Sequence, residues 1–334
     1  MSAVSSHASS LRAAAIDAVV AASKVCREVQ ARLVAGVSLQ KGDKSPVTVA
    51  DFAAQAIVSH MLAEVAPHIP MVGEEDASDL RKADNAGLRD KVVASVQAVI
   101  PSLSADDVLA AIDRGTYSGG PTGRHWVLDP IDGTKGFLRL DQYAVALALI
   151  EDGQVVLGVL GCPNLPVDAA NPDAGKGCIF AAVKGEHAVQ RGVDDATEHT
   201  ITVDPVASPA QARFCESVEK GHTSQSDSAK VAERLGITEP PYRIDSQCKY
   251  AAVARGDAAV YLRLPTRPGY VEKVWDHAAG VAVIEAAGGM VTDCRGETLD
   301  FSIGRGLSKN KGVIVTNGRF HADVVAAVRA QMGL

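Results

Sequence analysis

One hexapeptide, Asp129–Thr134 (DPIDGT), constrains this chain more than any other segment. It directly follows the apolar run Trp126–Leu128, which predicts a buried strand that ends at the Asp-Pro pair. Pro130 fixes φ and lacks an N–H, while Gly133 can adopt a backbone conformation closed to other residues. The two carboxylates can therefore turn onto one cation, and the turn can aim the Ile131 carbonyl at the same ion. Such oxygen ligands suit Mg²⁺, although Asp-Pro and Asp-Gly pairs also simply make turns.

Two further acidic segments have an ordinary structural explanation beside a functional one. Thr48 and Asp51 open a helix predicted over 48–64, where a capping box accounts for both residues without any metal. The Glu74–Asp76 run follows a short strand predicted over 69–73 and is typical of a solvated loop. Neither segment predicts a metal site by itself.

The segment Trp275–Gly280 (WDHAAG) predicts the start of a helix over 276–287. Asp276 is suited to cap that helix. The small residues behind it would also let a phosphate approach free N–H groups. His277 is interpreted as a packed, hydrogen-bonded histidine and not as a ligand.

Periodicity and turn residues predict the other elements. Helices are predicted over 9–35, 88–100, 105–112, 226–235, 246–255 and 322–332. Strands are predicted as hairpins over 143–150 with 155–160 and 178–183 with 187–190, and as single strands over 212–217, 258–264, 290–292 and 313–316. Turn formers at 41–46 predict a mobile loop. The pattern indicates an α+β domain over 1–200 and an α/β domain over 201–334.

Composition excludes several classes of protein. The 334 residues carry a formal net charge of -7 and only 4 % aromatic residues, which argues against binding nucleic acid or an anionic membrane. No apolar run reaches the ~20 residues of a membrane span, and no secretory pattern opens the chain. The six cysteines are scattered without a CxxC pair, so a reducing compartment is expected. The cytoplasm is the expected location, with an organelle left open.

The acidic segments gain meaning from their combination. Thr48-x-x-Asp51, Gly73-Glu74-Glu75, Asp129–Thr134 and Trp275–Gly280 occur in one order along one chain. In this the chain resembles the lithium-sensitive, magnesium-dependent phosphatase superfamily of inositol monophosphatases and fructose bisphosphatases. The resemblance covers nearly the whole chain and implies a layered αβαβα sandwich of the inositol monophosphatase type, of mixed α+β and α/β class.

Longer strings resemble one branch of that superfamily, the 3′(2′),5′-bisphosphate nucleotidases. They are Lys44–Asp51, Asp129–Arg139, Val218–His222, Asp245–Tyr250 and Val260–Pro265. The last three lie outside the predicted metal segments, where an inositol phosphatase would need a different pocket. The segment Gly120–Trp126 is similar to the plant-type branch.

The resemblance implies a cage for two or three Mg²⁺ ions. Its ligands would be Asp51, Glu74, Asp129, the Ile131 carbonyl, Asp132 and Asp276. Five carboxylates around one pocket repel one another strongly unless cations lie among them, and oxygen ligands favour Mg²⁺ over zinc. By the same resemblance, Thr134 bonds to Asp51 and, together with Glu74, orients and deprotonates the attacking water.

The resemblance also implies a nucleotide site. Its substrate-binding residues would be Gly133, Thr134, His222, Thr223, Ser246, Lys249, Arg263 and Asp276. Of these, Ser246, Lys249 and Arg263 would meet a 5′-phosphate, and His222 would lie near the adenine or ribose. Without the resemblance, Arg263 is equally well an outward residue of an edge strand and Lys249 a solvated helix position.

The implied activity is hydrolysis of the 3′-phosphate of 3′-phosphoadenosine 5′-phosphate to AMP and phosphate, sensitive to lithium. Because the metals contact phosphate and not the whole ligand, 3′-phosphoadenylyl sulfate and inositol 1,4-bisphosphate are further expected substrates. The alternatives are an inositol monophosphatase or sugar phosphatase, and, in another class, an inactive nucleotide-sensing protein. A monomer that binds a small-molecule substrate, and neither nucleic acid nor membrane, is expected.

Overall fold

The structure is a computed structural model, and it describes residues 3–34, 45–218, 224–267 and 269–334. Most of the 41–46 loop and of the Val218–His222 string lies outside these residues. In the described part of the chain no helix is both long enough and apolar enough to cross a membrane. The six cysteines are buried and free, as the absence of paired spacing predicts.

A seven-stranded sheet forms the first half of the molecule. Its strands follow the chain order β1 (Met71–Gly73), β2 (Arg124–Asp132), β3 (Ala144–Glu151), β4 (Gln154–Pro166), β5 (Lys176–Val183), β6 (Val189–Gly192) and β7 (His199–Thr200). β1 pairs with β2 in parallel, and the other neighbours are antiparallel. Both predicted hairpins are confirmed, β3 with β4 and β5 with β6.

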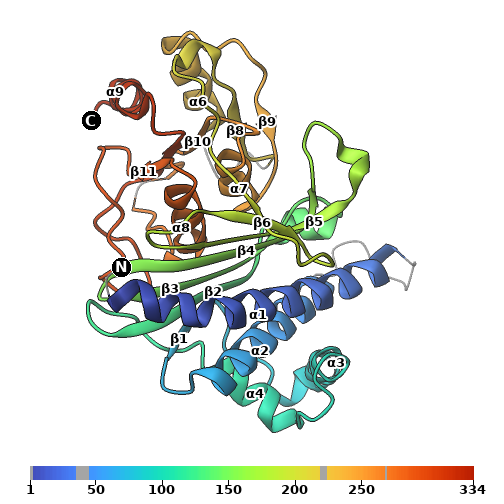
Figure 1. Cartoon of the computed structure of the whole chain (residues 1–334). Helices are drawn as coiled ribbons and strands as arrows, with labels where there is room; N and C mark the ends of the chain where they lie inside the picture. Colours follow the sequence, from blue (N-terminus) through green and yellow to red (C-terminus); the bar gives the residue numbers. More distant parts are fainter. Residues whose placement is uncertain (1–2, 35–44, 219–223, 268) are drawn as a thin grey trace.

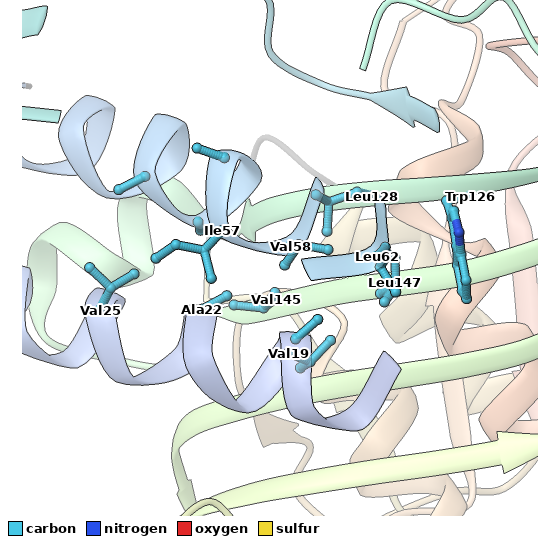
Figure 2. Close-up of a cluster of buried hydrophobic side chains, with 14 of the residues drawn as sticks. Val19, Ala22, Val25, Ile57, Val58, Leu62, Trp126, Leu128, Val145 and Leu147 are labelled. Carbon is cyan, nitrogen blue, oxygen red and sulfur yellow. The ribbon is translucent and has the colours of Figure 1, made fainter. Parts of the chain in front are cut away.

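Two long helices, α1 (Ala3–Val34) and α2 (Ser45–Val65), cover one face of this sheet (Figure 1). Figure 2 shows Val19 of α1 and Ile57 of α2 turned toward Val145 of the sheet, inside one buried apolar cluster. Alanines along both helices let them pack closely against each other. The shorter α3 (Ala86–Gln97) and α4 (Ala105–Asp113) pack on α2.

The second sheet has five strands in the order β11 (Met290–Thr292), β12 (Val313–Thr316), β10 (Val260–Arg263), β8 (Phe214–Glu216) and β9 (Tyr242–Arg243). Between the two sheets lie α7 (Cys248–Ala254) and α8 (Ala278–Ala286), and the outer face carries α6 (Gln225–Arg234) and α9 (His321–Met332) (Figure 1). The result is a five-layer αβαβα sandwich, as expected. One apolar cluster joins both sheets through α7 and α8, so this core is shared by the two halves.

Three local expectations about the acidic segments are wrong. β2 does not end at the Asp-Pro pair but continues to Asp132, with a register shift between Asp129 and Asp132 against β3. α2 begins at Ser45, so Thr48 lies inside the helix and cannot be its N-cap. Asp276 belongs to a short 3₁₀ turn, and His277 holds the N-cap position of α8.

The glycine at the start of α8 serves helix packing. A Cβ built on Gly280 would lie 2.3 Å from the Tyr250 ring of α7, and the Gly280 N–H donates to Gln247 Oε1 at 3.1 Å. The small residues here therefore admit a neighbouring aromatic ring, where the sequence suggested room for a phosphate.

Gly280→Ala should lower the free energy of unfolding by about 1–3 kcal/mol, because the added methyl group overpacks the contact between α7 and α8. Urea denaturation measures this effect. Gly87→Ala is the matched control, since a Cβ there meets nothing within 4 Å. Equal stability losses for the two variants would contradict the packing explanation.

Candidate active site

The end of β2 places the first two carboxylates. Asp129 is only 2 % exposed, and its Oδ1 atom has no hydrogen-bond partner among the described residues. Asp132 lies beyond the register shift, and its Oδ2 accepts the N–H of Gln247 at 2.6 Å. Since Gln247 immediately precedes α7, this bond ties the acidic strand of one half to the other half. A buried carboxylate oxygen without a donor is a natural ligand for a cation.

The backbone after Asp132 needs the glycine that follows. Gly133 has φ 92°, a left-handed conformation that glycine adopts readily, and it is the N-cap of α5 (Thr134–Arg139). A Cβ on Gly133 would lie 2.8 Å from the Cβ of Ser246. Ser246 itself has φ 64°, which is uncommon for a residue with a side chain. The two segments thus meet at close range, and the conformation predicted for Gly133 is confirmed.

Glu74 directly follows β1, and its N–H donates to the Leu128 carbonyl of β2 at 3.2 Å. Gln55 of α2 holds the next residue, since its Nε2 donates to the Glu75 carbonyl at 2.5 Å and its Oε1 accepts the Glu75 N–H at 3.1 Å. Sequence reasoning did not identify Gln55, which is fully buried and reads like any polar helix residue. Asp51 lies four residues earlier on α2 and is 8 % exposed.

These elements surround a cavity of about 430 Å³ between the two halves. Among the predicted site residues, it is lined by Glu74, Asp129, Ile131, Asp132, Gly133, Thr134, Ser246, Lys249, Arg263 and Asp276. Asp51 is not among the described lining residues, but its charge acts on Asp129. His222 and Thr223 lie outside the described residues.

The carboxylates of the cavity destabilise one another's charged forms. Burial, followed by repulsion from Glu74, raises the pKa of Asp51 well above its usual range, and burial and the same neighbour do so for Asp129. The Glu74 side chain is exposed to solvent, yet partial desolvation and then repulsion from Glu75 and Asp276 raise its pKa to about 8. Burial, with Asp276 next in importance, raises the pKa of Asp132 to about 6. Bound cations would stabilise the charged forms of such a cluster.

Two cationic side chains, Lys249 and Arg263, line the same cavity. Lys249 of α7 is 5 % exposed, and burial lowers its pKa; its Nζ lies 5.2 Å from the centre of the Tyr261 ring. Arg263 of β10 reaches Asp276 Oδ2 at 2.9 Å and Glu272 Oε2 at 2.8 Å through Nη2. The solvated helix position considered for Lys249 and the outward edge-strand position considered for Arg263 are therefore both wrong. α7 is sandwiched between the sheets, and β10 lies in the interior of its sheet.

The donor set around Asp129 fits Mg²⁺, because it consists of oxygen atoms, includes the orphaned Asp129 Oδ1, and carries strong mutual repulsion. A second acidic group, Glu272, Asp276 and His277, is the one among the described residues whose potential ligand atoms lie within 4.8 Å of one another. That group already contains the Arg263 guanidinium, which bonds to both of its carboxylates. It is therefore the poorer candidate for a cation. His277, with 0 % exposure, bonds to Tyr250 and Glu272, as the packed interpretation predicts.

A further arginine, unidentified from sequence, connects the two acidic halves of the site. Arg305 donates through Nη2 to the Gly73 carbonyl at 2.5 Å, and through Nη1 to the carbonyls of Gly115 and Tyr117 at 3.1 Å each. Its guanidinium carbon lies 4.8 Å from the centre of the Trp275 ring. The residues after Gly73 and Trp275 are Glu74 and Asp276, so one side chain bonds to the backbone before one carboxylate and packs on the ring before the other.

Arg305→Met should lower the free energy of unfolding by about 2–4 kcal/mol, because three carbonyls lose a charged donor. Chemical denaturation measures the loss, with Arg319→Met, at an exposed arginine of the same half, as the control. Arg305→Lys keeps the charge but not the forked geometry and should fall between the two. A loss below about 0.5 kcal/mol for Arg305→Met, the range of ordinary surface substitutions, would contradict this role.

Several solved structures have the same fold as this chain at low sequence identity. An inositol monophosphatase from Anabaena superposes with a TM-score of 0.64 at 19 % identity, over 96 % of each chain. SuhB from Mycobacterium tuberculosis gives 0.63 at 20 % identity, over 98 % of each chain. These similarities establish the inositol monophosphatase fold.

Curated relatives are much more similar in sequence. A protein from Emericella nidulans named 3′(2′),5′-bisphosphate nucleotidase is 46 % identical, with 89 % of this chain and 91 % of the relative covered. Proteins of the same name are 45 % identical in Oryza sativa and 44 % identical in Schizosaccharomyces pombe, each over 95 % of this chain and at least 93 % of the relative. Fungal and plant relatives are thus about equally similar, so these identities do not single out the plant-type branch.

The model of one family, described as the inositol monophosphatase family, matches residues 7–333. The match spans both sheets and every acidic segment discussed above. On this match and on the relatives' identities, the chain belongs to the inositol monophosphatase family.

Proposed function

We propose that this protein is a magnesium-dependent phosphatase that hydrolyses the 3′-phosphate of 3′-phosphoadenosine 5′-phosphate to AMP and phosphate. One observation carries the proposal: a single cavity is lined both by the acidic cluster and by two cations, the buried Lys249 and the half-buried Arg263. The acidic cluster suits a metal-assisted phosphate transfer, and the cations suit a second phosphate away from the metals. The relatives named 3′(2′),5′-bisphosphate nucleotidase support the same substrate.

The acidic cluster would hold two or three Mg²⁺ ions. The ligands we assign are Asp51, Glu74, Asp129, the Ile131 carbonyl, Asp132 and Asp276. Bound Mg²⁺ supplies Lewis-acid polarisation of a phosphate group and of a water molecule. The bond from the Gln247 N–H orients the Asp132 carboxylate, and the Arg305 bond to the Gly73 carbonyl holds the backbone before Glu74.

The chain's own residues would handle the water and the phosphate. We assign Glu74 and Thr134, together with Asp51, to orienting the attacking water and accepting its proton. Thr134 is exposed at the start of α5 and lines the cavity beside Gly133, where both can contact the phosphate that is removed, as can Asp276.

Substrate selection would come from the second half of the chain. We assign Ser246, Lys249 and Arg263, which line the cavity, to the 5′-phosphate. His222 and Thr223 remain predicted contacts of the nucleoside. The same division supports a proposed boundary near residue 200, with most metal ligands in 1–200 and the nucleotide contacts in 201–334.

The finer cellular assignment is also a proposal. Six buried free thiols suit a reducing compartment, and we propose a cytoplasmic monomer that acts on a small molecule and binds no nucleic acid or membrane. Analytical ultracentrifugation of the purified protein tests the oligomeric state.

Phosphate release from four substrates tests the proposed activity. With Mg²⁺ present, we expect 3′-phosphoadenosine 5′-phosphate to be hydrolysed with a kcat/KM at least about 10²-fold above that of inositol 1-phosphate. The sulfate-bearing nucleotide 3′-phosphoadenylyl sulfate and inositol 1,4-bisphosphate should lie between them, and Li⁺ should inhibit. Equal or faster hydrolysis of inositol 1-phosphate would instead support an inositol phosphatase, and bound nucleotide without turnover would support a sensor.

A further inference from the structure

A buried glutamate outside the cage bonds to the arginine of the nucleotide site. Glu272 is 5 % exposed, and its Oε2 lies 2.8 Å from Arg263 Nη2. Arg263 lines the main cavity, whereas Glu272 lines only a smaller neighbouring one of about 250 Å³ in the described structure. Glu272 therefore reaches the substrate cavity through Arg263 and not directly.

Glu272 also makes contacts with residues other than Arg263. Its Oε2 lies 3.3 Å from His277 Nε2, and the other ring nitrogen, Nδ1, lies 2.7 Å from the Tyr250 hydroxyl. The Glu272 carbonyl accepts the N–H of Leu307 at 2.8 Å. Glu272 is thus held through its side chain by His277 and through its backbone by Leu307, and it can set the position of the group that it bonds.

The second carboxylate on Arg263 has another task under the proposed function. Asp276 lies 2.9 Å from the same Nη2, but it is also assigned to the metal cage. A carboxylate that binds a divalent cation attracts a guanidinium more weakly, because the cation offsets part of its negative charge. Glu272 has no such competing role, and its pKa of about 2, held down against burial by His277 and Arg263, keeps it ionised. It is the constant anionic partner of Arg263.

We propose that Glu272 is a positioning residue for substrate specificity, which holds the Arg263 guanidinium where it can bind the 5′-phosphate of a nucleoside bisphosphate. The inference rests on the proposed function, because it needs a substrate with a second phosphate. Without Glu272, the Arg263 guanidinium can move with Asp276 toward the cage or adopt another rotamer. Substrate binding must then supply the free energy that orders Arg263, which weakens the affinity.

Glu272→Gln keeps the shape of the side chain and removes its charge. We expect the KM for adenosine 3′,5′-bisphosphate to rise about tenfold with kcat within about twofold, while kcat/KM for adenosine 3′-phosphate, which lacks the 5′-phosphate, stays unchanged. Calorimetric affinity for AMP should fall by a similar factor. In an Arg263→Ala background, Glu272→Gln should have no further effect, because the residue acts through Arg263. Asp257→Asn, which breaks a half-buried ion pair with Arg255 elsewhere, is the control and should leave the KM for both substrates unchanged.

An unchanged KM for the bisphosphate, or an equal rise for both substrates, would overturn the inference. If Glu272→Gln does not fold, Glu272→Asp keeps the charge but shortens the side chain, and it must show the same selective rise in KM. A wild-type protein that does not prefer the bisphosphate over the 3′-monophosphate would count against the proposed function itself. The wild-type ratio of kcat/KM for the bisphosphate to kcat/KM for the 3′-monophosphate therefore distinguishes a failure of this inference from a failure of the proposed function.

Discussion

Asp129→Asn should reduce Mg²⁺-dependent phosphate release by at least about 10³-fold in kcat/KM while making the metal-free protein more stable. The activity is lost because the amide cannot supply the negative charge that the metal requires. The stability rises because the amide needs no proton to be neutral, whereas burial and then repulsion from its neighbours disfavour the charged form of Asp129 and raise its pKa well above its usual range. Steady-state kinetics and thermal unfolding in the presence of a chelator measure the two effects.

The opposite signs of these effects distinguish a functional cluster from a structural one. Asp106→Asn, at an exposed acidic residue in the first turn of α4, is the control and should change activity little. An Asp129→Asn protein that is less stable than the wild type without metal would show that the carboxylate stabilises the fold. One that keeps a tenth of the activity would show that Asp129 is not a required ligand.

The metal-free protein should lose stability as the pH rises from 6.5 to 8, with its Tm falling by about 1–2 °C, because solvent screens the exposed Glu74 side chain. The pKa of Glu74 is about 8 in the folded protein, against 4.5 for an ordinary glutamate, so the folded state binds more protons than the unfolded state in this range. The stabilisation from this proton is complete below pH 4.5 and is lost as the pH passes through 8. Asp51 and Asp129 have raised pKa values and act in the same direction.

The chosen pH range lies above the titration of the buried histidine that acts in the opposite direction. Burial lowers the pKa of His321 to about 4, which makes stability increase with pH only up to the ordinary histidine value of 6.5. Glu74→Gln should flatten the decrease above that pH. Excess Mg²⁺ should remove it in the wild type, because cations then take the place of protons. A Tm that rises with pH in the metal-free wild type would contradict the assignment.

Much of the fold is predictable because its signals are local. The Asp-Gly turn at 152–153 and the flanking β-branched runs specify the hairpin of β3 and β4, and both strands form as expected. Thr48 and Asp51 show the limit of such signals. Their spacing matches a capping box, but α2 starts earlier with Ser45 and Pro46, and proline is well tolerated in a first helical turn.

The residues that sequence reasoning missed act across long stretches of chain. Arg305 reaches Gly73 over 232 positions, and nothing near either residue in the sequence indicates the contact. Lys249 looks solvated for a similar reason, since burial of α7 on both faces depends on two sheets that form elsewhere. Asp129 and Asp132 could be identified from the turn residues beside them, whereas Asp51, Glu74 and Asp276 are indicated only by the resemblance of the four segments to a known phosphatase superfamily.

The acidic composition of the chain now has a partial explanation. Five of its 40 acidic residues are assigned to a cage that divalent ions would neutralise, so the net charge of -7 does not by itself oppose an anionic substrate.

The most direct test of this account is a crystal structure grown with Mn²⁺, whose anomalous scattering locates the ions without any assay of activity. The account predicts anomalous peaks among Glu74, Asp129, the Ile131 carbonyl and Asp132, with Arg263 still bonded to Glu272. A peak among Glu272, Asp276 and His277, with none beside Asp129, would contradict it.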